Sequence, residues 1–178
     1  METRPYRPIA LIGLMGAGKS EVARMLARRL DAPALDLDAL IEADSGASIE
    51  QWFERHGEAA FRQREREMLN QALERAPGVI ACGGGIVLDQ QARALLANHC
   101  RTVWLEVSPA EAARRLAGVE RSRPLLGEGE PSARLTQLLG ERDALYRGAA
   151  QVRVPTDGRS ASQVADAVLE ALASAGHA

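Results

Sequence analysis

Cysteine, aromatic residues and long apolar runs are scarce in this 178-residue chain. The two cysteines, Cys82 and Cys100, offer neither a disulfide framework nor metal-ligand spacing, which argues against a disulfide-rich or zinc-binding module. No apolar run approaches the roughly 18 residues that a membrane-spanning helix needs. The opening segment, Met1 to Pro8, has no apolar stretch of the kind found in signal peptides. We therefore expect a cytoplasmic protein without a membrane partner.

The chain also lacks an excess of one charge and has almost no lysine. The formal net charge is −2, with no long run of one sign, which argues against nucleic acid as the main partner. Among 22 basic residues only Lys19 is a lysine, and the others are arginines. A lysine carries a compact ammonium group, whereas an arginine carries a broad planar fork. Because Lys19 lies in a glycine-rich motif, we infer that a tight phosphate site requires the smaller cation there.

Short apolar runs alternate with amphipathic stretches along the chain, which is typical of an α/β fold with a mainly parallel sheet. The length suits one domain over residues 1–178. We expect a five-stranded parallel sheet with strands at Ile9–Gly13, Ala34–Leu37, Val79–Ala81, Thr102–Val107 and Gln151–Val154. Helices are expected at Lys19–Leu30 and Asp38–Ala43, from Ser48, at Glu58–Arg75 and Asp89–Ala97, from Ser108, and at Arg134–Tyr146 and Ser160–Ala173.

The segment from Gly13 to Ser20 matches the P-loop pattern G-x-x-x-x-G-K-S in full, between an expected strand and an expected helix. Backbone N–H groups of such a loop converge on phosphate oxygens, and the helix N-terminus adds partial positive charge. We predict that Lys19 contacts the β- and γ-phosphates of ATP and that the Ser20 hydroxyl binds Mg²⁺. The other ATP-binding residues predicted in this loop are Gly16, Ala17, Gly18 and Glu21.

The scarcity of lysine also narrows the class of P-loop protein. A GTPase would need a lysine in its guanine-reading Asn-Lys-x-Asp loop, and Lys19 is already used by the phosphate motif. A large ATPase motor would need a longer chain and an oligomerisation surface. A small-molecule or nucleotide kinase remains, so the expected fold is a three-layer α/β/α P-loop kinase fold.

Two carboxylates close the second expected strand. Asp36 and Asp38 are two residues apart, so on a strand their side chains would project to the same side. They would lie at the carboxyl end of the sheet, where α/β folds bind ligands. One carboxylate can hold a Mg²⁺-bound water while the other accepts hydrogen bonds from substrate hydroxyls. The alternative is that one of them, most plausibly Asp38, is the N-cap of the next helix.

Further motifs follow in order along the chain: Phe53-x-x-x-Gly57-Glu58-x-x-Phe61-Arg62-x-x-Glu65, Gly83-Gly84-Gly85, Arg123-Pro-Leu-Leu126 and Glu141-Arg142-x-x-Leu145-Tyr146. Together with the P-loop and Asp36-Leu-Asp38, this ordered set resembles shikimate kinase from about Ile9 to Val168. The departure is Ala144, where that family commonly has proline. The resemblance implies transfer of the γ-phosphoryl group of MgATP to the 3-hydroxyl of shikimate, in the chorismate and aromatic amino acid pathway. It also implies a monomer, a helical substrate-binding region at about 38–69 and a mobile lid at about 117–131.

The resemblance also assigns roles to individual residues. It places Asp36 on the metal side, through water, and Asp38 on the attacking hydroxyl. Arg62 and Arg142 match the arginines that bind the substrate carboxylate, a group that suits a guanidinium fork. The lid arginine is Arg123, the third predicted catalytic residue beside Lys19 and Asp38. The remaining substrate and adenine positions are Gly83, Gly84 and Gly85, with Gly84 in direct contact, and Arg115 and Arg159, whose planes would sandwich the base.

Less specific interpretations stay open for several of these residues. Arg62 lies in a charged stretch that a solvated helix face would explain, and Arg142 could pair with a neighbouring carboxylate. Phe53 and Phe61 suit either an apolar wall beside the substrate or ordinary helix packing. At the level of the whole chain, the alternatives are a kinase for another small hydroxy acid such as gluconate, and a regulator that binds ATP without turnover.

Overall fold

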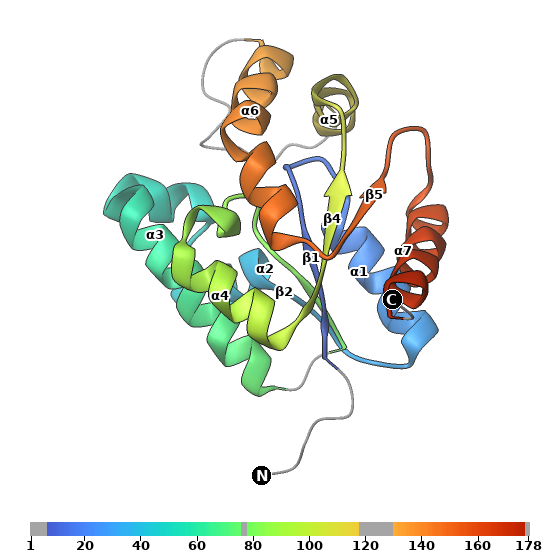
Figure 1. The fold of residues 1–178 in the computed structure, drawn as a ribbon. Coiled ribbons are helices and arrows are strands. Elements are labelled where there is room, and N and C mark those ends of the chain that lie inside the picture. Colours follow the sequence, from blue (N-terminus) through green and yellow to red (C-terminus); the bar gives the residue numbers. More distant parts are fainter. Residues whose placement is uncertain (1–6, 76–77, 118–129, 177–178) are drawn as a thin grey trace.

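Five parallel strands form the middle layer of the computed structural model: β1 (Ile9–Ile12), β2 (Ala34–Asp36), β3 (Val79–Ala81), β4 (Arg101–Glu106) and β5 (Val152–Pro155). Their order across the sheet is β2-β3-β1-β4-β5 (Figure 1). The structure describes residues 7–75, 78–117 and 130–176. The predicted five-stranded parallel sheet is confirmed, with strand ends within two residues of the expected positions.

Seven α-helices of the described residues surround the sheet: α1 (Lys19–Leu30), α2 (Leu37–Ser45), α3 (Ile49–Glu74), α4 (Gln90–His99), α5 (Pro109–Leu116), α6 (Pro131–Ala149) and α7 (Ala161–Ala175). Helices α1 and α7 pack on one face of the sheet, and α3 and α4 cover the other (Figure 1). A short 3₁₀ helix, Ile86–Leu88, follows the triple glycine and was not expected from the sequence. The molecule is therefore the expected three-layer α/β/α domain.

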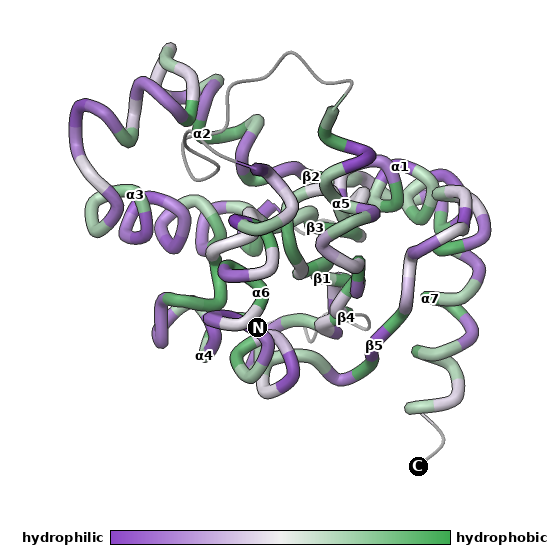
Figure 2. Tube along the Cα trace, turned by 90° about the horizontal axis from the view of Figure 1, so that it is seen from above, coloured by the Kyte–Doolittle hydropathy of each residue, from purple (hydrophilic) through white to green (hydrophobic). Residues whose placement is uncertain are grey.

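The central strand explains why the first apolar run is continuous. Ile9 and Leu11 pack into the core on the α1 and α7 side, whereas Ala10 and Ile12 pack into the core on the α3 and α4 side. A strand buried on both faces needs apolar residues at every position. Figure 2 shows the same arrangement from above, with hydrophobic colour along the inner strands and hydrophilic colour on much of the outer helices.

Helix α3 consists of the expected pair of helices, which meet at a kink. Its start is the predicted capping box, in which Ser48 accepts from the Gln51 backbone and the Gln51 side chain accepts from the Ser48 backbone. The helix then runs to Glu74 with one interruption at Gly57, whose φ of 78° and ψ of 174° are not helical. A positive φ suits glycine. The two expected helices are thus confirmed, and the break lies directly before Glu58, where the second helix was expected to begin.

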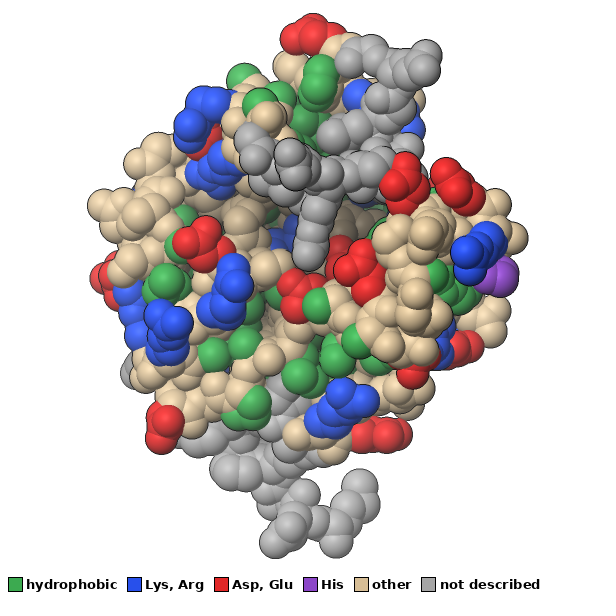
Figure 3. Space-filling view, turned by 180° about the vertical axis from the view of Figure 1, so that it is seen from behind, with side chains coloured by type: hydrophobic (Ala, Val, Ile, Leu, Met, Phe, Trp, Pro, Cys, Tyr) green, Lys and Arg blue, Asp and Glu red, His purple; other side chains and the backbone are tan. Residues whose placement is uncertain are grey.

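No helix within the described ranges is long and apolar enough to cross a membrane. On the face shown in Figure 3, basic and acidic side chains are interspersed rather than gathered by sign. The predicted lid, at about 117–131, falls mostly outside the described residues, and so does Arg123.

Candidate active site

A cavity of about 650 Å³ lies over the carboxyl ends of β1, β2 and β3. Its volume is within the range of small-molecule sites, roughly 300–1,000 Å³. The connection after β1 leads to β2, toward one edge of the sheet, whereas the connection after β3 leads past β1 to β4, toward the other edge. The cavity therefore lies where the direction of the connections reverses, which is where open α/β sheets bind ligands. The loops after β1 and β3 meet there, since a side-chain carbon at Gly84 would lie 3.4 Å from the Gly13 carbonyl oxygen.

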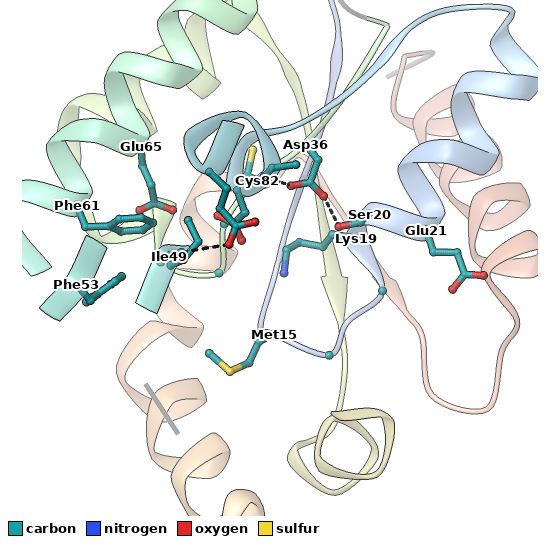
Figure 4. Close-up of a pocket in the computed structure, with 18 of the residues that line it drawn as sticks. Met15, Lys19, Ser20, Glu21, Asp36, Ile49, Phe53, Phe61, Glu65 and Cys82 are labelled. Atoms are coloured by element: carbon teal, nitrogen blue, oxygen red, sulfur yellow. Dashed lines mark hydrogen bonds between the residues drawn. The ribbon is translucent and has the colours of Figure 1, made fainter. Parts of the chain in front are cut away.

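The P-loop holds its shape through close backbone packing and through its lysine. A Cβ at Gly13 would lie 2.4 Å from the Leu105 carbonyl oxygen, and the φ of Gly13 is +142°, so only glycine fits this position. Lys19 Nζ donates to the carbonyl oxygens of Gly13 and Leu14, at 2.9 Å in each case. The lysine therefore sits at the mouth of the loop and points into the cavity (Figure 4).

Asp36 and Asp38 both line the cavity, but the expectation that they share one side of a strand is wrong. Asp36 ends β2 and is the N-cap of α2, accepting a hydrogen bond from the Ala39 backbone at 3.2 Å, so Asp38 lies in the first helical turn. The cap is thus Asp36 rather than Asp38. The other oxygen of Asp36 accepts a hydrogen bond from the Ser20 hydroxyl (Figure 4). This contact joins the P-loop helix to the second strand.

Asp38 and the buried Glu65 converge on Gly83. A Cβ built at Gly83 would lie 2.2 Å from Glu65 Oε1 and 2.9 Å from Asp38 Oδ1. No side chain could occupy that position without displacing a carboxylate. The triple-glycine loop therefore begins with a residue whose lack of a side chain lets two acidic groups approach the backbone.

Arg62 lies beside the other end of the same loop, at Gly85. A Cβ at Gly85 would lie 2.3–2.4 Å from the carbon and both terminal nitrogens of its guanidinium. Nη1 donates to Glu65, and Nη2 donates to Glu58 Oε1 at 3.1 Å. The guanidinium carbon also lies 5.4 Å from the centre of the Phe61 ring, which is a cation–π distance. The alternative of a solvated Arg62 is thus excluded, because its side chain is buried.

Arg142 reaches the loop from α6. It is 2 % exposed, and its Nη1 donates to the Gly84 carbonyl oxygen at 3.1 Å. The same oxygen accepts from the hydroxyl of Tyr146, one helical turn further along α6. Arg142 is therefore bound to the glycine loop and not to a neighbouring surface carboxylate.

Several buried polar atoms of this cluster have no hydrogen-bond partner within the part of the chain that the structure describes. They are Arg62 Nε, Arg142 Nε and Glu65 Oε1. Leaving a buried polar atom unpaired is costly, so such atoms ask for an explanation. Both arginines line the cavity, and two guanidinium groups beside one cavity fit an anionic ligand.

Burial raises the pKa of two groups in this cluster, the Glu65 carboxyl and the Tyr146 hydroxyl. It raises the pKa of the Glu65 carboxyl to about 7, although the nearby Arg62 guanidinium acts in the opposite direction. The charge of Asp38 raises the pKa of Glu65 further. Burial also raises the pKa of the Tyr146 hydroxyl to about 12, so this group remains a donor at neutral pH.

The structure separates the two arginines predicted to hold the adenine. Arg115 lines the cavity and donates to the Gly16 carbonyl oxygen at 3.2 Å. Arg159 is exposed and lines a second, smaller hollow on α7 of about 290 Å³. Their shared contact is with Thr156, which accepts from the Arg115 guanidinium and from the Arg159 backbone N–H.

Most of the predicted site residues meet in one cavity. It is lined by Gly16, Gly18, Lys19, Ser20, Glu21, Asp36, Asp38, Arg62, Gly83, Gly84, Gly85, Arg115 and Arg142. Ala17 is buried within the same loop. Figure 4 shows the Glu21 carboxylate directed away from Lys19, so its negative charge does not crowd the lysine.

Glu65 and Tyr146 belong to the motifs, but sequence reasoning gave neither a role. The signal for Glu65 is its place in an apolar stripe, because Phe61, Glu65, Met68 and Leu69 recur at helical spacing and all are buried. Phe53 and Phe61 pack against each other and also form part of the cavity wall, so both roles considered for them in the sequence apply. Their rings pack 4.5 Å apart, and both line the cavity.

The residues beside the P-loop fit a magnesium ion bound together with nucleotide phosphates. Ser20 and Asp36 supply oxygen ligands in direct contact, and Mg²⁺ prefers oxygen. Among the described residues no group of three or more His, Cys, Asp or Glu could form a metal cage. Mg²⁺ usually relies on one or two protein ligands plus substrate phosphates, so this sparse donor set agrees with such a site.

Comparisons with known proteins agree with this geometry. The family model described as shikimate kinase matches residues 15–173. The chain belongs to the shikimate kinase family. A shikimate kinase from Thermobifida fusca is 46% identical over 171 residues, covering 96% of this chain and 98% of the relative. One from Rhodococcus jostii is 40% identical over 163 residues, covering 92% and 96% respectively.

Solved structures of shikimate kinases share the fold. The enzyme from Acinetobacter baumannii, solved in complex with shikimate, gives a TM-score of 0.90 at 36% identity and covers 96% of this chain and 94% of its own. A gluconokinase from Sinorhizobium meliloti gives a TM-score of 0.58 at 18% identity, covering 97% and 94%. At that identity the gluconokinase shows a shared fold alone.

Proposed function

We propose that this protein is a shikimate kinase that transfers the γ-phosphoryl group of MgATP to the 3-hydroxyl of shikimate, giving shikimate 3-phosphate and ADP. It would thereby serve chorismate and aromatic amino acid biosynthesis. The observation that carries the proposal is the pair Arg62 and Arg142, both buried against the triple glycine in the same cavity as the P-loop. Two arginines that line one cavity suit a substrate carboxylate, which shikimate has and a neutral sugar lacks.

The reaction needs positioning and charge stabilisation more than covalent chemistry. Lys19 neutralises charge on the β- and γ-phosphates, and Arg123 from the lid adds a second cation to the transferring group. Asp38 orients the attacking hydroxyl, and its carboxylate is the nearest candidate to take the proton. Glu65 holds Arg62 from behind, so it acts on the substrate carboxylate through that arginine.

Mg²⁺ would be held by the Ser20 hydroxyl and, through water, by Asp36. When bound, the ion neutralises phosphate charge during transfer. Asp36 can serve it because its other oxygen is already fixed by the helix cap. Arg115 and Arg159 would flank the adenine.

The remaining expectations belong to the same proposal. The helical region at about 38–69 forms the substrate side, and the segment at about 117–131 closes as a lid. We further propose a cytoplasmic monomer that acts on shikimate and ATP, without nucleic acid or membrane partners.

A substrate panel tests the proposal. ADP formation from ATP would be measured with shikimate, gluconate and other small hydroxy acids. We expect turnover with shikimate and little with the others, because the chain belongs to the shikimate kinase family and shares only 18% identity with the gluconokinase. Turnover of gluconate but not shikimate would refute the substrate assignment.

Two variants separate an enzyme from a regulator that only binds ATP. Asp38→Asn should lower kcat by at least about 100-fold, the usual contribution of a positioned acid–base group, with ATP affinity retained. Asp44→Asn is the matched control, since Asp44 is an exposed acid on the same helix. Arg123→Ala should lower kcat far more than ATP affinity, and equal losses in both would contradict its role on the transferring phosphoryl group.

A further inference from the structure

Thr156 directly follows β5, contacts the cavity-lining Arg115 and is almost completely buried, at 1 % exposed. Its backbone N–H donates to the Glu106 carbonyl oxygen at 2.8 Å, which extends the pairing of β5 with β4 by one residue. None of the sequence motifs contains it. The strand pairing therefore holds the backbone of Thr156 in place.

Thr156 offers two acceptors to Arg115. Its hydroxyl oxygen accepts from Arg115 Nη1 at 3.1 Å, and its carbonyl oxygen accepts from Nη2 at 2.7 Å. The same guanidinium donates from Nη1 to the Gly16 carbonyl oxygen at 3.2 Å and from Nε to Glu111 Oε1 at 2.8 Å. All N–H groups of a guanidinium lie in its plane. These acceptors therefore fix the plane of Arg115 and leave its two faces without hydrogen bonds.

The carbonyl oxygen of Thr156 also accepts from the backbone N–H of Arg159 at 3.1 Å. This hydrogen bond closes a short turn in which Gly158 has a φ of +69°. Both arginines predicted to hold the base thus bind Thr156. Arg115 does so through its guanidinium, and Arg159 does so through its backbone N–H.

We propose that Thr156 is a positioning residue for the purine ring of ATP, because it sets the plane of Arg115 on which the base stacks. The inference rests on the proposed role of Arg115 at the adenine. A planar base can stack on a planar guanidinium only if the plane is held at the right angle, and a fixed plane avoids the loss of side-chain freedom on binding.

The phosphate loop does not depend on Thr156 in the same way. Gly16 packs directly on α5, since a Cβ there would lie 3.0 Å from the Cα and carbonyl oxygen of Ala112. The Ala17 backbone N–H donates to the Leu14 carbonyl oxygen at 3.2 Å. Weakening the hold on Arg115 should therefore harm binding of the base and leave phosphate binding intact.

The test compares Thr156→Val, which removes the hydroxyl at nearly constant volume, with Thr156→Ser, which keeps it. Inhibition constants would be measured for ADP and for inorganic tripolyphosphate, both with Mg²⁺, in competition with ATP. We expect Thr156→Val to raise the constant for ADP about five- to tenfold, the scale of one lost hydrogen bond that orients the guanidinium. The constant for tripolyphosphate should change less than about twofold, and Thr156→Ser should return the ADP constant toward the wild-type value. Equal losses for both inhibitors, or no loss for ADP, would overturn the proposal.

The chain supplies a matched control. Thr102 is also 1 % exposed, but its hydroxyl has no partner among the residues that the structure describes, and it is the second residue of β4, at the opposite end of the sheet. Thr102→Val should leave both inhibition constants unchanged. If this control also weakened ADP, the effect of Thr156→Val would be a general consequence of altering a buried threonine.

A variant of Arg115 and a calorimetric measurement of ADP binding test the same proposal independently. Arg115→Lys keeps the charge but loses the planar fork, so it should reproduce the selective loss of ADP affinity, and wild-type ADP affinity in this variant would refute the proposal. Calorimetric titration of ADP needs no phosphoryl acceptor. A wild-type protein that failed to phosphorylate shikimate would refute the proposed function, while the ADP titrations would still test Thr156.

Discussion

Replacing Gly85 with alanine tests the arrangement of the substrate arginine. The backbone of Gly85, at φ −105° and ψ 4°, is accessible to alanine, so the change introduces one methyl group without backbone strain. That methyl carbon would lie 2.3 Å from the guanidinium carbon of Arg62, whereas carbon atoms in contact are about 3.5–4.0 Å apart. Arg62 must therefore retreat by about 1 Å or more.

This displacement of Arg62 should weaken the binding of the substrate. Arg62 is enclosed by Phe61 and by its hydrogen bonds to Glu58 and Glu65, so it cannot move aside and keep its direction. A displacement of about 1 Å at a binding group can cost about 100-fold in rate. That factor corresponds to about 2.7 kcal/mol of lost transition-state stabilisation. We expect kcat/KM for shikimate to fall about 100-fold in Gly85→Ala, with the KM for ATP within about twofold of wild type.

Steady-state kinetics with each substrate varied in turn would measure both effects. Gly148→Ala is the matched control, because a Cβ at this exposed position of α6 meets no atom of the described residues within 4 Å. It should leave the kinetics unchanged and raise stability by about 0.5–1 kcal/mol, the usual gain from glycine to alanine in a helix. A Gly85→Ala protein with wild-type kcat/KM for shikimate would refute the reasoning.

Three further predictions concern charge, protonation and helix capping. Lys19→Arg should lower kcat at least about 100-fold despite its retained charge, because the fork does not fit between the Gly13 and Leu14 carbonyls; substantial activity would contradict this. The pKa of Glu65 is raised to about 7 in the folded protein, so the folded state binds its proton more tightly and this group's contribution to stability falls as pH rises from about 4.5 to about 7. The Tm of wild type minus that of Glu65→Gln should therefore decrease between pH 5 and pH 8, and a constant difference would show that Glu65 titrates normally. Ser48→Ala should cost about 1 kcal/mol and lower Tm by about 2–4 °C through loss of the α3 cap, whereas an unchanged Tm would mean that the capping box is not stabilising.

Local chemistry made much of the fold predictable. The capping box at Ser48 and the Ser108 cap followed by Pro109 each specify a helix start without reference to the rest of the chain. The uninterrupted apolar run of β1 specifies a strand buried on both faces. These signals are local, so they can be read before the fold is known.

What could not be predicted depends on contacts between distant segments. Asp36 rather than Asp38 caps α2, because either residue could do so and only the three-dimensional path of the strand decides. Arg62 and Glu65 lie in a stretch that reads as a solvated helix, and their burial depends on the glycine loop reached some 20 residues later. The resemblance to a family supplied Arg62, but it could not supply the partners that hold it.

The hydrogen bonds of Lys19 and Ser20 have a consequence for calorimetry. The ammonium group already donates to two loop carbonyls, and the hydroxyl already donates to Asp36. Phosphate oxygens that bind Lys19 would therefore share its three N–H groups with these carbonyls, whereas the Ser20 oxygen can bind a metal ion through its lone pairs and still donate to Asp36. The enthalpy measured when a nucleotide binds will report a difference between two sets of polar contacts, so it should be smaller than a count of contacts in the complex suggests. In this loop, affinity is governed by which partner each group prefers.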